Sequence, residues 1–363
     1  MDRTMRIQLT EVREGDILLR DIFNDHGTLV LSAGTILKAK DRGLLERHMI
    51  DQLDIIERLT PQYSIDSMAE AVVERHTSKN ASKEQLIHQY EAAIQHTNLI
   101  FESAAQDGMV EDEVIEQTYL PLLSQIEKER DVVSLMMLMN GEEDYTYQHS
   151  IQVSVLSFYL ATWLGYSEEN ARRVGKAGYL HDIGKCMIDR KLINKPGALN
   201  DEEFDQIKQH TLFGQQIISN SFEDEWLSLA ALQHHERMDG TGYPVGLTAD
   251  RIHEVARIVA VADVYSAMIS NRVYRKKQDL FSVLKEMNQM SYSLLDPHIT
   301  HTFIRKMLPN FLSKRAKLSD GRVGIIIMNH HTEFFRPLIQ LDQQFIDLST
   351  NRSIEIEEIM INA

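Results

Sequence analysis

Histidine is the residue type in this chain whose number and placement most need explaining. The 363 residues include 15 histidines, whereas cysteine occurs once, at Cys186. Several histidines and two aspartates continue the apolar stripe of a segment with helical spacing, where side chains turn toward a core. Burying an ionised aspartate without a partner is costly, so such groups persist only where something compensates their charge. The pattern therefore predicts a buried polar site.

Seven side chains share this pattern, and they come from five separate segments of the sequence. In each segment, helical steps from apolar residues lead to an imidazole or a carboxylate that would point inward. The seven are His149, His181, Asp182, His210, His234, His235 and Asp263. An alternative is that each is an unrelated core residue bonded to a nearby carbonyl group, but this alternative weakens when all seven are considered together.

The chemical types of these side chains suit a metal centre. Five imidazoles and two carboxylates with few buried cationic side chains nearby leave negative charge to be compensated. Mixed imidazole and carboxylate ligands suit iron, manganese, zinc or nickel. The lack of thiolates in the set argues against a closed structural zinc site. We therefore expect these side chains to bind metal.

The elements that would position these residues are mainly helices. From about residue 130 to 315 the apolar spacing is helical, and it is interrupted at 195–197 and 239–244 by segments that contain glycine and proline. Short apolar runs outside this region, such as 28–31 and 323–328, are typical of strands. The expected fold class is mainly α, with a small α+β module at the N-terminus and a short β-rich tail at the C-terminus.

Two expected helix starts bear directly on the site. Asn200 and Glu203 can form a capping box at the start of a helix that continues past His210. A second helix is expected to start at Arg251 and to carry Asp263. The expected domains are an α+β module at 1–62, a helical linker region at 63–130, the site-bearing domain at 131–316 and a β-rich extension at 317–363.

Composition excludes several classes of protein. Lysine and arginine number 38 and aspartate and glutamate number 54, which gives a net charge of −16. Such a charge repels duplex nucleic acid and anionic lipid, so neither polymeric nucleic acid nor a membrane is expected as a partner. A single cysteine excludes an intramolecular disulfide framework.

One uncharged segment is long enough to cross a bilayer. It runs from Tyr145 to Ser167. Polar residues recur between its apolar residues at helical spacing, which favours a buried amphipathic helix over a membrane span. The sequence opens without an apolar signal segment, so the protein is expected to be cytoplasmic.

Two motifs resemble those of a known family. The segment 181–185, HDIGK, resembles the signature of the HD superfamily of metal-dependent phosphohydrolases. The segment 234–244, HHERMDGTGYP, is similar to the second signature of its HD-GYP branch, and 195–197 and 271–275 also fit that branch. The resemblance covers about residues 140 to 310, so the flanking modules lie outside it.

The resemblance implies an HD-type helical bundle that hydrolyses the bacterial second messenger cyclic di-GMP at a centre of two or three metal ions. The positions that match ligands common to HD proteins are His149, His181, Asp182 and Asp263. The positions that match the additional histidines of the HD-GYP branch are His210, His234 and His235. Asp182 would bridge the two sets. Members with three metal ions have a glutamate where this chain has Tyr145, so two divalent ions, iron or manganese, are expected here.

The same resemblance implies a cyclic-guanylate-specific phosphodiesterase, with Asp182 and Lys185 as catalytic residues. A hydroxide bridging the metal ions would attack the phosphorus, giving the linear dinucleotide pGpG and, if hydrolysis continues, GMP. Lys185 would contact a phosphate oxygen or protonate the leaving group. Arg272 and Arg275 would bind phosphate or guanine edges, and Tyr243 would contact the substrate or brace its own loop.

Other functions are compatible with the same residues. The enzyme could hydrolyse another cyclic dinucleotide or a nucleotide, because the metal chemistry would be the same. The domain could also be a non-catalytic receptor for cyclic di-GMP, although such receptors usually lack a ligand and none of the seven is missing here. The flanking modules are candidates for homodimer formation or for contact with a regulatory partner. Cys186 is expected to be a packing residue and not a nucleophile.

Overall fold

The computed structural model describes most of the chain, and the chain divides into two compact units. The described residues are 4–19, 22–23, 29–31, 35–56, 87–126, 132, 135–136, 145–269, 280–330, 333–342 and 344–360. Unit 1 is Met1–Gln85 and unit 2 is Leu86–Ala363. Each unit has a hydrophobic core of its own.

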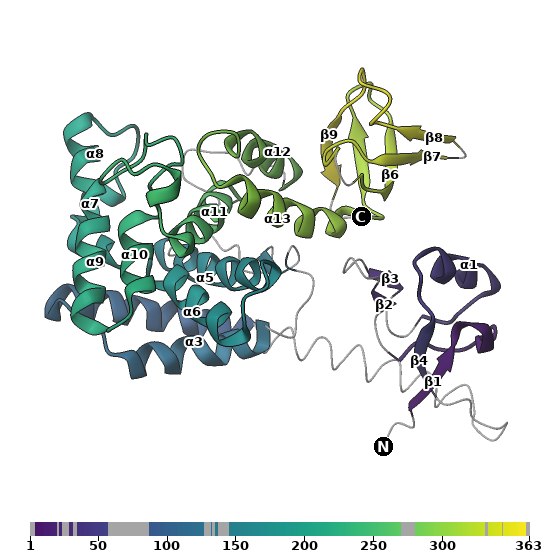
Figure 1. The fold of residues 1–363 in the computed structure, drawn as a ribbon, viewed down its shortest axis with the longest axis horizontal. Coiled ribbons are helices and arrows are strands. Elements are labelled where there is room, and N and C mark those ends of the chain that lie inside the picture. Colours follow the sequence, from purple (N-terminus) through teal and green to yellow (C-terminus); the bar gives the residue numbers. More distant parts are fainter. Residues whose placement is uncertain are drawn as a thin grey trace. The chain divides into compact units, whose positions relative to one another are not determined.

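Unit 1 is a small α+β module (Figure 1). Its elements are β1 (Thr4–Gln8), the 3₁₀ helix η1 (Leu9–Glu11), β2 (Ile22–Phe23), β3 (Leu29–Leu31), α1 (Ala39–Arg47) and β4 (Gln52–Ile56). Strand β1 pairs antiparallel with β4, and β2 pairs antiparallel with β3. The buried core consists of Ile7, Leu9, Leu18, Ile22, Leu37, Leu45, Leu53 and Ile55. The sequence therefore predicts the character of this module correctly.

Unit 2 is mainly helical. After a helical segment at 87–107, its helices are α3 (Asp112–Ile126), α5 (Tyr145–Trp163), α6 (Glu168–Leu180), α7 (Arg190–Ile193), α8 (Asp201–Lys208), α9 (His210–Ser221), α10 (Glu225–Gln233), α11 (Glu254–Ile269), α12 (Leu280–Met290) and α13 (Pro297–Met307). Short 3₁₀ helices are η2 (Ile183–Met187), η3 (Ala249–Arg251) and η4 (Leu308–Phe311). Helix α5 packs against α6, α11 and α13, and α10 packs against α6, α9 and α11 (Figure 1).

Helix α5 is buried on every side along residues 148–161, so its expected burial is confirmed, whereas the expected amphipathic pattern is absent. Its polar side chains look like a solvent-facing stripe in the sequence, but they form hydrogen bonds inside the bundle. Ser154 Oγ, for example, donates to the Gly175 carbonyl oxygen at 2.9 Å. Among the described residues, none of the helices combines the length and the apolar character needed to cross a bilayer.

The helix expected from Asn200 past His210 is divided in two at Gln209. The predicted capping box is present: Glu203 N donates to Asn200 Oδ1 at 2.8 Å, and Asn200 N donates to Glu203 Oε2 at 2.9 Å. Helix α8 then ends, Gln209 caps it, and His210 opens α9. The break matters for the site because His210 becomes a residue at the start of a helix.

Helix α11 begins at Glu254, three residues later than expected. Arg251 belongs to the separate 3₁₀ helix η3. The chain then turns at His253, whose backbone N–H donates to Gln233 Oε1 at 2.8 Å. This contact ties the start of α11 to the end of α10, so Asp263 is carried by a helix anchored beside two of the expected ligands.

Unit 2 ends in a five-stranded antiparallel sheet. Its strands are β5 (Arg315–Leu318), β6 (Val323–Met328), β7 (Leu338–Leu341), β8 (Gln344–Asp347) and β9 (Ile356–Met360), in the order β8-β7-β6-β5-β9. The buried residues on one face include Ala316, Leu318, Ile326, Ile339 and Ile359. Strand β9 contacts α12, and Lys285 Nζ donates to Glu355 Oε2 at 2.7 Å.

The expected fold class is confirmed. The chain is mainly helical, with a small α+β segment at its N-terminal end and a β-rich C-terminal end. The four domain boundaries drawn from the sequence, at 1–62, 63–130, 131–316 and 317–363, remain predictions.

Candidate metal centre

The structure brings all seven expected ligands into one cluster within unit 2. His149 lies in α5 and Asp263 in α11, His181 and Asp182 follow α6, His210 opens α9, and His234 and His235 follow α10. Six of these residues are buried, and the His235 side chain is 19% exposed. Helix ends supply most of the cluster, so its geometry depends on where each helix stops.

Asp182 lies between two pairs of imidazoles. Its Oδ2 is 3.3 Å from His181 Nε2 and 3.8 Å from His149 Nε2. Its Oδ1 is 3.3 Å from His210 Nε2 and 3.7 Å from His234 Nε2. Each carboxylate oxygen therefore faces a different pair of ligand nitrogens, which is the arrangement of a carboxylate shared between two sites.

Asp263 lies beside two of the imidazoles. Its Oδ1 is 3.0 Å from His149 Nε2, and its Oδ2 is 3.9 Å from His235 Nδ1. Two groups have ligand atoms within 4.8 Å of one another: His149, His181 and Asp182 form one, and Asp182, His210, His234 and His235 form the other. These two clusters are consistent with a metal site.

Backbone carbonyl groups fix the orientation of three imidazoles. The Nδ1 atoms of His181, His210 and His234 lie 2.7 Å from Gly178 O, 2.6 Å from Ile207 O and 3.0 Å from both Ala230 O and Ala231 O. A carbonyl oxygen can only accept, so each Nδ1 carries the proton and each Nε2 of the neutral ring keeps a lone pair. These lone pairs point into the cluster, as in metal-binding histidines whose other nitrogen is held by the protein.

A side-chain relay orients His149 in the same way. Ser266 Oγ donates its proton to Gln152 Oε1 at 2.8 Å, so it accepts from His149 Nδ1 at 2.9 Å. The proton on Nδ1 leaves the Nε2 lone pair of His149 facing Asp263. Two electron-pair donors that face each other at 3.0 Å repel unless a cation lies between or beside them. Neither Ser266 nor Gln152 was identified from the sequence.

Replacing Ser266 with alanine is expected to lower metal affinity about 10- to 100-fold, the usual effect of losing a partner that orients a ligand. Competition with a chromophoric chelator measures the change. Ser150→Ala is the matched control, because it removes another hydroxyl of the same region, one that donates to the Thr146 carbonyl oxygen of its own helix. An equal loss of affinity in both variants would rule out a specific role for the relay.

Burial keeps most of the imidazoles neutral. Loss of hydration lowers the pKa of four histidines: His149, His234, His235 and His210, the last to about 3. Burial acts in the same direction on His181, but the neighbouring Asp182 carboxylate outweighs it and raises the pKa of His181. At neutral pH at least four of the five rings are therefore in the form that can bind a cation.

Both aspartates stay ionised in spite of their burial. Burial raises the pKa of Asp182, but the Lys185 ammonium and the His181 ring outweigh it, and the pKa lies well below its usual range. Burial likewise opposes the ionised form of Asp263, and the adjacent His149 ring contributes most to holding the pKa of Asp263 well below its usual range. The cluster thus presents two carboxylates at neutral pH.

Two buried atoms of the cluster, His181 Nε2 and Asp182 Oδ1, form no hydrogen bond with any of the described residues. Buried polar atoms are nearly always paired, so two unpaired ones in a single cluster need an explanation. In the neutral ring of His181 and the ionised carboxylate of Asp182, both atoms carry lone pairs that face the interior of the site. The residues present therefore fit divalent cations, which would accept the lone pairs and balance the two carboxylates.

Residues next to Asp182 differ in what they contribute. Lys185 forms an ion pair with Asp182, and its side chain is 23% exposed, so its ammonium group lies at the edge of the cluster. Burial raises the pKa of the Cys186 thiol to about 11. The thiol is protonated at neutral pH, and a protonated thiol is a poor nucleophile.

Of the expected substrate-binding residues, Tyr243 lies against the cluster. Its ring centroid is 4.6 Å from that of His235, with 33° between the planes, and its backbone N–H donates to the His235 carbonyl oxygen at 3.2 Å. Burial raises the pKa of its phenol, which stays protonated. Arg272 and Arg275 lie outside the described residues, as does the side chain of Tyr145.

Glu236 fixes the loop that carries Tyr243, and sequence reasoning missed it. Its carboxylate, 2% exposed, accepts backbone N–H groups from Val245 at 2.8 Å, Gly246 at 3.1 Å and Leu247 at 2.8 Å. A Cβ atom on Gly242 would overlap the chain at Glu236, so glycine permits this close packing. The available signal was a carboxylate placed directly after two expected ligands.

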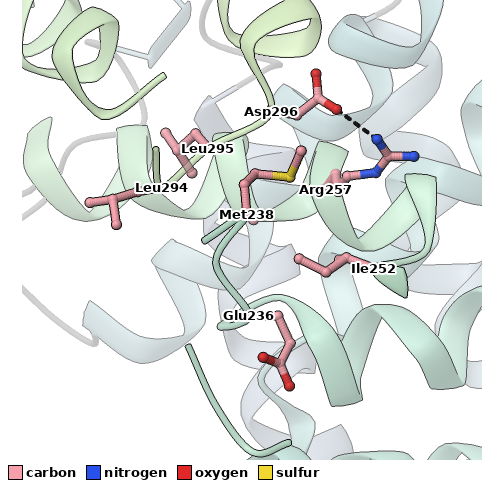
Figure 2. A pocket seen from close by; sticks show the side chains of 8 residues that line it. Glu236, Met238, Ile252, Arg257, Leu294, Leu295 and Asp296 are labelled. Carbon is pink, nitrogen blue, oxygen red and sulfur yellow. Dashed lines mark hydrogen bonds and ion pairs between the residues drawn. The ribbon is translucent and has the colours of Figure 1, made fainter. Parts of the chain in front are cut away.

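A small cavity near Glu236 is separate from this chemistry. It has a volume of about 10 Å³ and is lined by Glu236, Met238, Ile252, Arg257, Ala260, Leu294, Leu295 and Asp296. Figure 2 shows Arg257 joined to Asp296 beside Met238, with the Glu236 carboxylate pointing away from this pair; the Arg257–Asp296 bond is 2.7 Å. The cavity has room for about one water molecule and not for a nucleotide.

Comparison with known proteins shows what this region is similar to. Residues 133–299 match the family model described as HD domain. A cyclic di-GMP phosphodiesterase of Pseudomonas aeruginosa is 33% identical over 228 residues, which are 60% of this chain and 55% of that protein. One from Thermotoga maritima is 39% identical over 47% of each chain. A 3′3′-cGAMP-specific phosphodiesterase of Vibrio cholerae is 34% identical over 48% of this chain and 42% of that protein.

The matched segments cover only about half of each relative, so the comparisons concern the domain that holds the cluster. The expected resemblance to cyclic di-GMP phosphodiesterases of the HD-GYP type is confirmed. All seven clustered residues fall within the matched region. Residues 133–299 therefore match the HD domain family, and this region is similar in sequence to cyclic dinucleotide phosphodiesterases.

Proposed function

We propose that the protein is a metal-dependent phosphodiesterase that hydrolyses cyclic di-GMP to pGpG, with GMP as the product of a second cleavage. The observation that carries the proposal is the position of Asp182, whose two oxygens face separate pairs of imidazoles. A carboxylate in that position suits a pair of cations, and paired cations suit phosphodiester hydrolysis. The relatives named for cyclic di-GMP support the choice of substrate.

The chain's own residues would hold two divalent cations, iron or manganese. One set of ligands would be His149, His181, Asp182 and Asp263, and the other would be Asp182, His210, His234 and His235. When bound, the cations would supply an activated water as nucleophile and would neutralise the phosphate charge. The neutral imidazoles and ionised aspartates described above are ready to bind cations at neutral pH, with little proton release.

Lys185 is the residue we assign to the phosphate itself. Its ammonium group lies at the edge of the cluster, beside the Asp182 carboxylate. A charged group there can stabilise a non-bridging oxygen of the phosphodiester as negative charge develops, or donate a proton to the leaving ribose oxygen. The ion pair with Asp182 orients Lys185 until the substrate arrives. Tyr243, Arg272 and Arg275 remain the other proposed substrate contacts.

A second candidate substrate is 3′3′-cGAMP. The relative from Vibrio cholerae that is 34% identical to this chain is named for that nucleotide. The metal centre acts on the phosphodiester, which both nucleotides share, so the cluster alone does not distinguish them. A non-catalytic receptor is the third candidate, and the presence of all seven clustered residues weighs against it.

The test is anaerobic purification, metal analysis and an assay of hydrolysis by chromatography. We expect about two metal ions per chain, and cleavage of cyclic di-GMP by iron- or manganese-loaded protein that is lost with EDTA and restored by the metal. Cyclic di-AMP and 3′3′-cGAMP are assayed in parallel. Faster cleavage of 3′3′-cGAMP would replace the substrate assignment. Binding of cyclic di-GMP by metal-loaded protein without cleavage would establish the receptor and overturn the proposal.

A further inference from the structure

An exposed aromatic ring lies beside the metal cluster. Phe204, near the start of α8, is 43% exposed. Its ring centroid is 6.0 Å from that of Tyr243, with 81° between the planes. Tyr243 in turn packs on His235 at 4.6 Å. Two ring-to-ring steps therefore separate Phe204 from a proposed metal ligand.

The surrounding contacts hold Phe204 in place. The capping box between Asn200 and Glu203 fixes the first turn of α8. Lys195 Nζ bonds to both carboxylate oxygens of Glu203 at 2.6 Å, which ties the preceding loop to the same turn. An aromatic ring on such a braced turn loses little conformational freedom when a ligand packs on it.

A cation accompanies the ring. Lys208 Nζ lies 4.6 Å from the centroid of the Phe204 ring and 5.9 Å from that of Tyr243. Its ammonium group also bonds to Asp205 at 2.8 Å, on the exposed side of the helix. The chain carries a net charge of −16, which repels an anionic nucleotide. A lysine held over aromatic rings at the edge of the proposed phosphate-binding site offsets that repulsion locally. Aromatic faces next to a cation are a typical environment for nucleic-acid bases and phosphates.

We propose that Phe204, flanked by Tyr243 and Lys208, is a platform on which one purine base of the cyclic dinucleotide stacks while its phosphate is at the metal cluster. This inference rests on the proposed function, because the cluster determines where the phosphate lies. A base attached to a phosphate held beside His235 can reach across Tyr243 to Phe204. Lys208 covers part of the Phe204 ring and meets the charge of the nucleotide.

Stacking depends on the π-face that every base has, so the platform accepts guanine and adenine alike. We therefore expect Phe204 to contribute to affinity for cyclic di-GMP and 3′3′-cGAMP to a similar extent. Discrimination between these nucleotides would then arise from other contacts. The platform selects for the presence of a base and not for its identity.

Phe204→Ala is the test, made in the full chain. Calorimetry with metal-loaded protein and a non-hydrolysable phosphorothioate analogue of each nucleotide measures binding without turnover, and steady-state kinetics are measured with the same metal-loaded protein. Loss of base stacking is expected to raise Kd and KM for both nucleotides about 5- to 150-fold, with a smaller change in kcat. Phe204→Trp keeps a stacking surface and should restore affinity. In Phe204→Ala, the rise in KM for the cyclic dinucleotides should be at least fivefold larger than the rise in KM for methyl p-nitrophenyl phosphate, a phosphodiester without a nucleobase.

Leu212→Ala is the matched control, because Leu212 in α9 is 41% exposed and belongs to no part of the site. Equal losses for cyclic di-GMP and methyl p-nitrophenyl phosphate in Phe204→Ala would mean that the ring only braces the Tyr243 loop, and would overturn the platform. Unchanged Kd and KM in Phe204→Ala would also overturn the platform. The same conclusion would follow if wild-type protein bound no cyclic dinucleotide with or without metal. Wild-type protein that binds but never cleaves the nucleotides, with affinity still dependent on Phe204, would support the platform and overturn the proposed hydrolase.

Discussion

Asp182→Ala is expected to abolish both the paired binding of cations and the hydrolysis of cyclic di-GMP. The two oxygens of Asp182 face different imidazole pairs, so a single substitution removes a ligand from both positions. We expect fewer than two metal ions per chain and a fall in kcat/KM of at least about 1,000-fold, equivalent to about 4 kcal/mol of barrier. Metal analysis and chromatographic assay of pGpG measure the two effects.

Asp182→Asn is the matched variant, because it keeps the shape of the side chain and one ligand oxygen but removes the charge. Its metal content should lie between those of the wild type and Asp182→Ala. Asp250→Ala removes an exposed carboxylate of η3 and should leave both quantities unchanged. If circular dichroism shows a folded Asp182→Ala protein that retains two metal ions and wild-type activity, the bridging role is wrong.

Gly184→Ala is expected to damage the site through packing alone. Gly184 lies in η2 against α9, and a Cβ atom there would overlap the His210 carbonyl oxygen and the Gly214 backbone nitrogen. Both obstacles are main-chain atoms and cannot rotate away, so η2 and α9 must separate. We expect the free energy of unfolding to fall by about 3 kcal/mol or more, at the upper end for overpacked cores. Urea denaturation followed by circular dichroism measures the change.

Separation of η2 from α9 also moves Asp182 away from His210, so metal affinity should fall with stability. Gly214→Ala is the control on the other side of the same contact, because a Cβ atom on Gly214 would be 3.4 Å from its nearest neighbours. That distance is ordinary van der Waals contact, and the variant should retain its fold. Wild-type stability and metal content in Gly184→Ala would contradict the close packing of η2 on α9.

The sequence predicts which residues make up the cluster because buried helix faces have apolar residues at helical spacing, and a polar residue at that spacing is visible in the sequence. His149, His234 and Asp263 each continue an apolar stripe, and a polar residue on such a stripe must be satisfied inside the protein. His210 follows the stripe of its own segment in the same way, and the two motifs contain His181, Asp182 and His235. Local spacing therefore identifies the side chains, and the structure adds which oxygen or nitrogen faces which.

The course of the helices was harder to predict where no strong breaker marks a change. Gln209 keeps nearly helical backbone angles, φ −61° and ψ −19°, so nothing in its residue type signals the break between α8 and α9. The burial of α5 on all sides was missed for a related reason. Small polar side chains such as Ser154 look solvent-facing in a sequence, and only the neighbouring helix reveals their hydrogen-bond partner.

Contacts between distant segments could not be predicted from spacing. The relay from His149 through Ser266 to Gln152 joins α5 to α11. Ser266 and Gln152, which form its second hydrogen bond, are 114 residues apart along the chain. The packing of Phe204 near Tyr243 depends on the path of the intervening loop and helices. Such contacts depend on tertiary structure, and a hydrophobic pattern within one helix carries no record of them.

The three N–H groups gathered by Glu236 have a consequence for protein engineering. Glu236 is adjacent in sequence to His235, and the segment that it binds carries Tyr243. The proposed metal-binding and substrate-facing residues of this region are therefore rigidly connected. A loop from another enzyme grafted at 239–247 would need to arrive with amides spaced to meet the same carboxylate. Directed evolution of substrate preference is therefore expected to accept changes at exposed Val245 more readily than insertions or deletions within this loop.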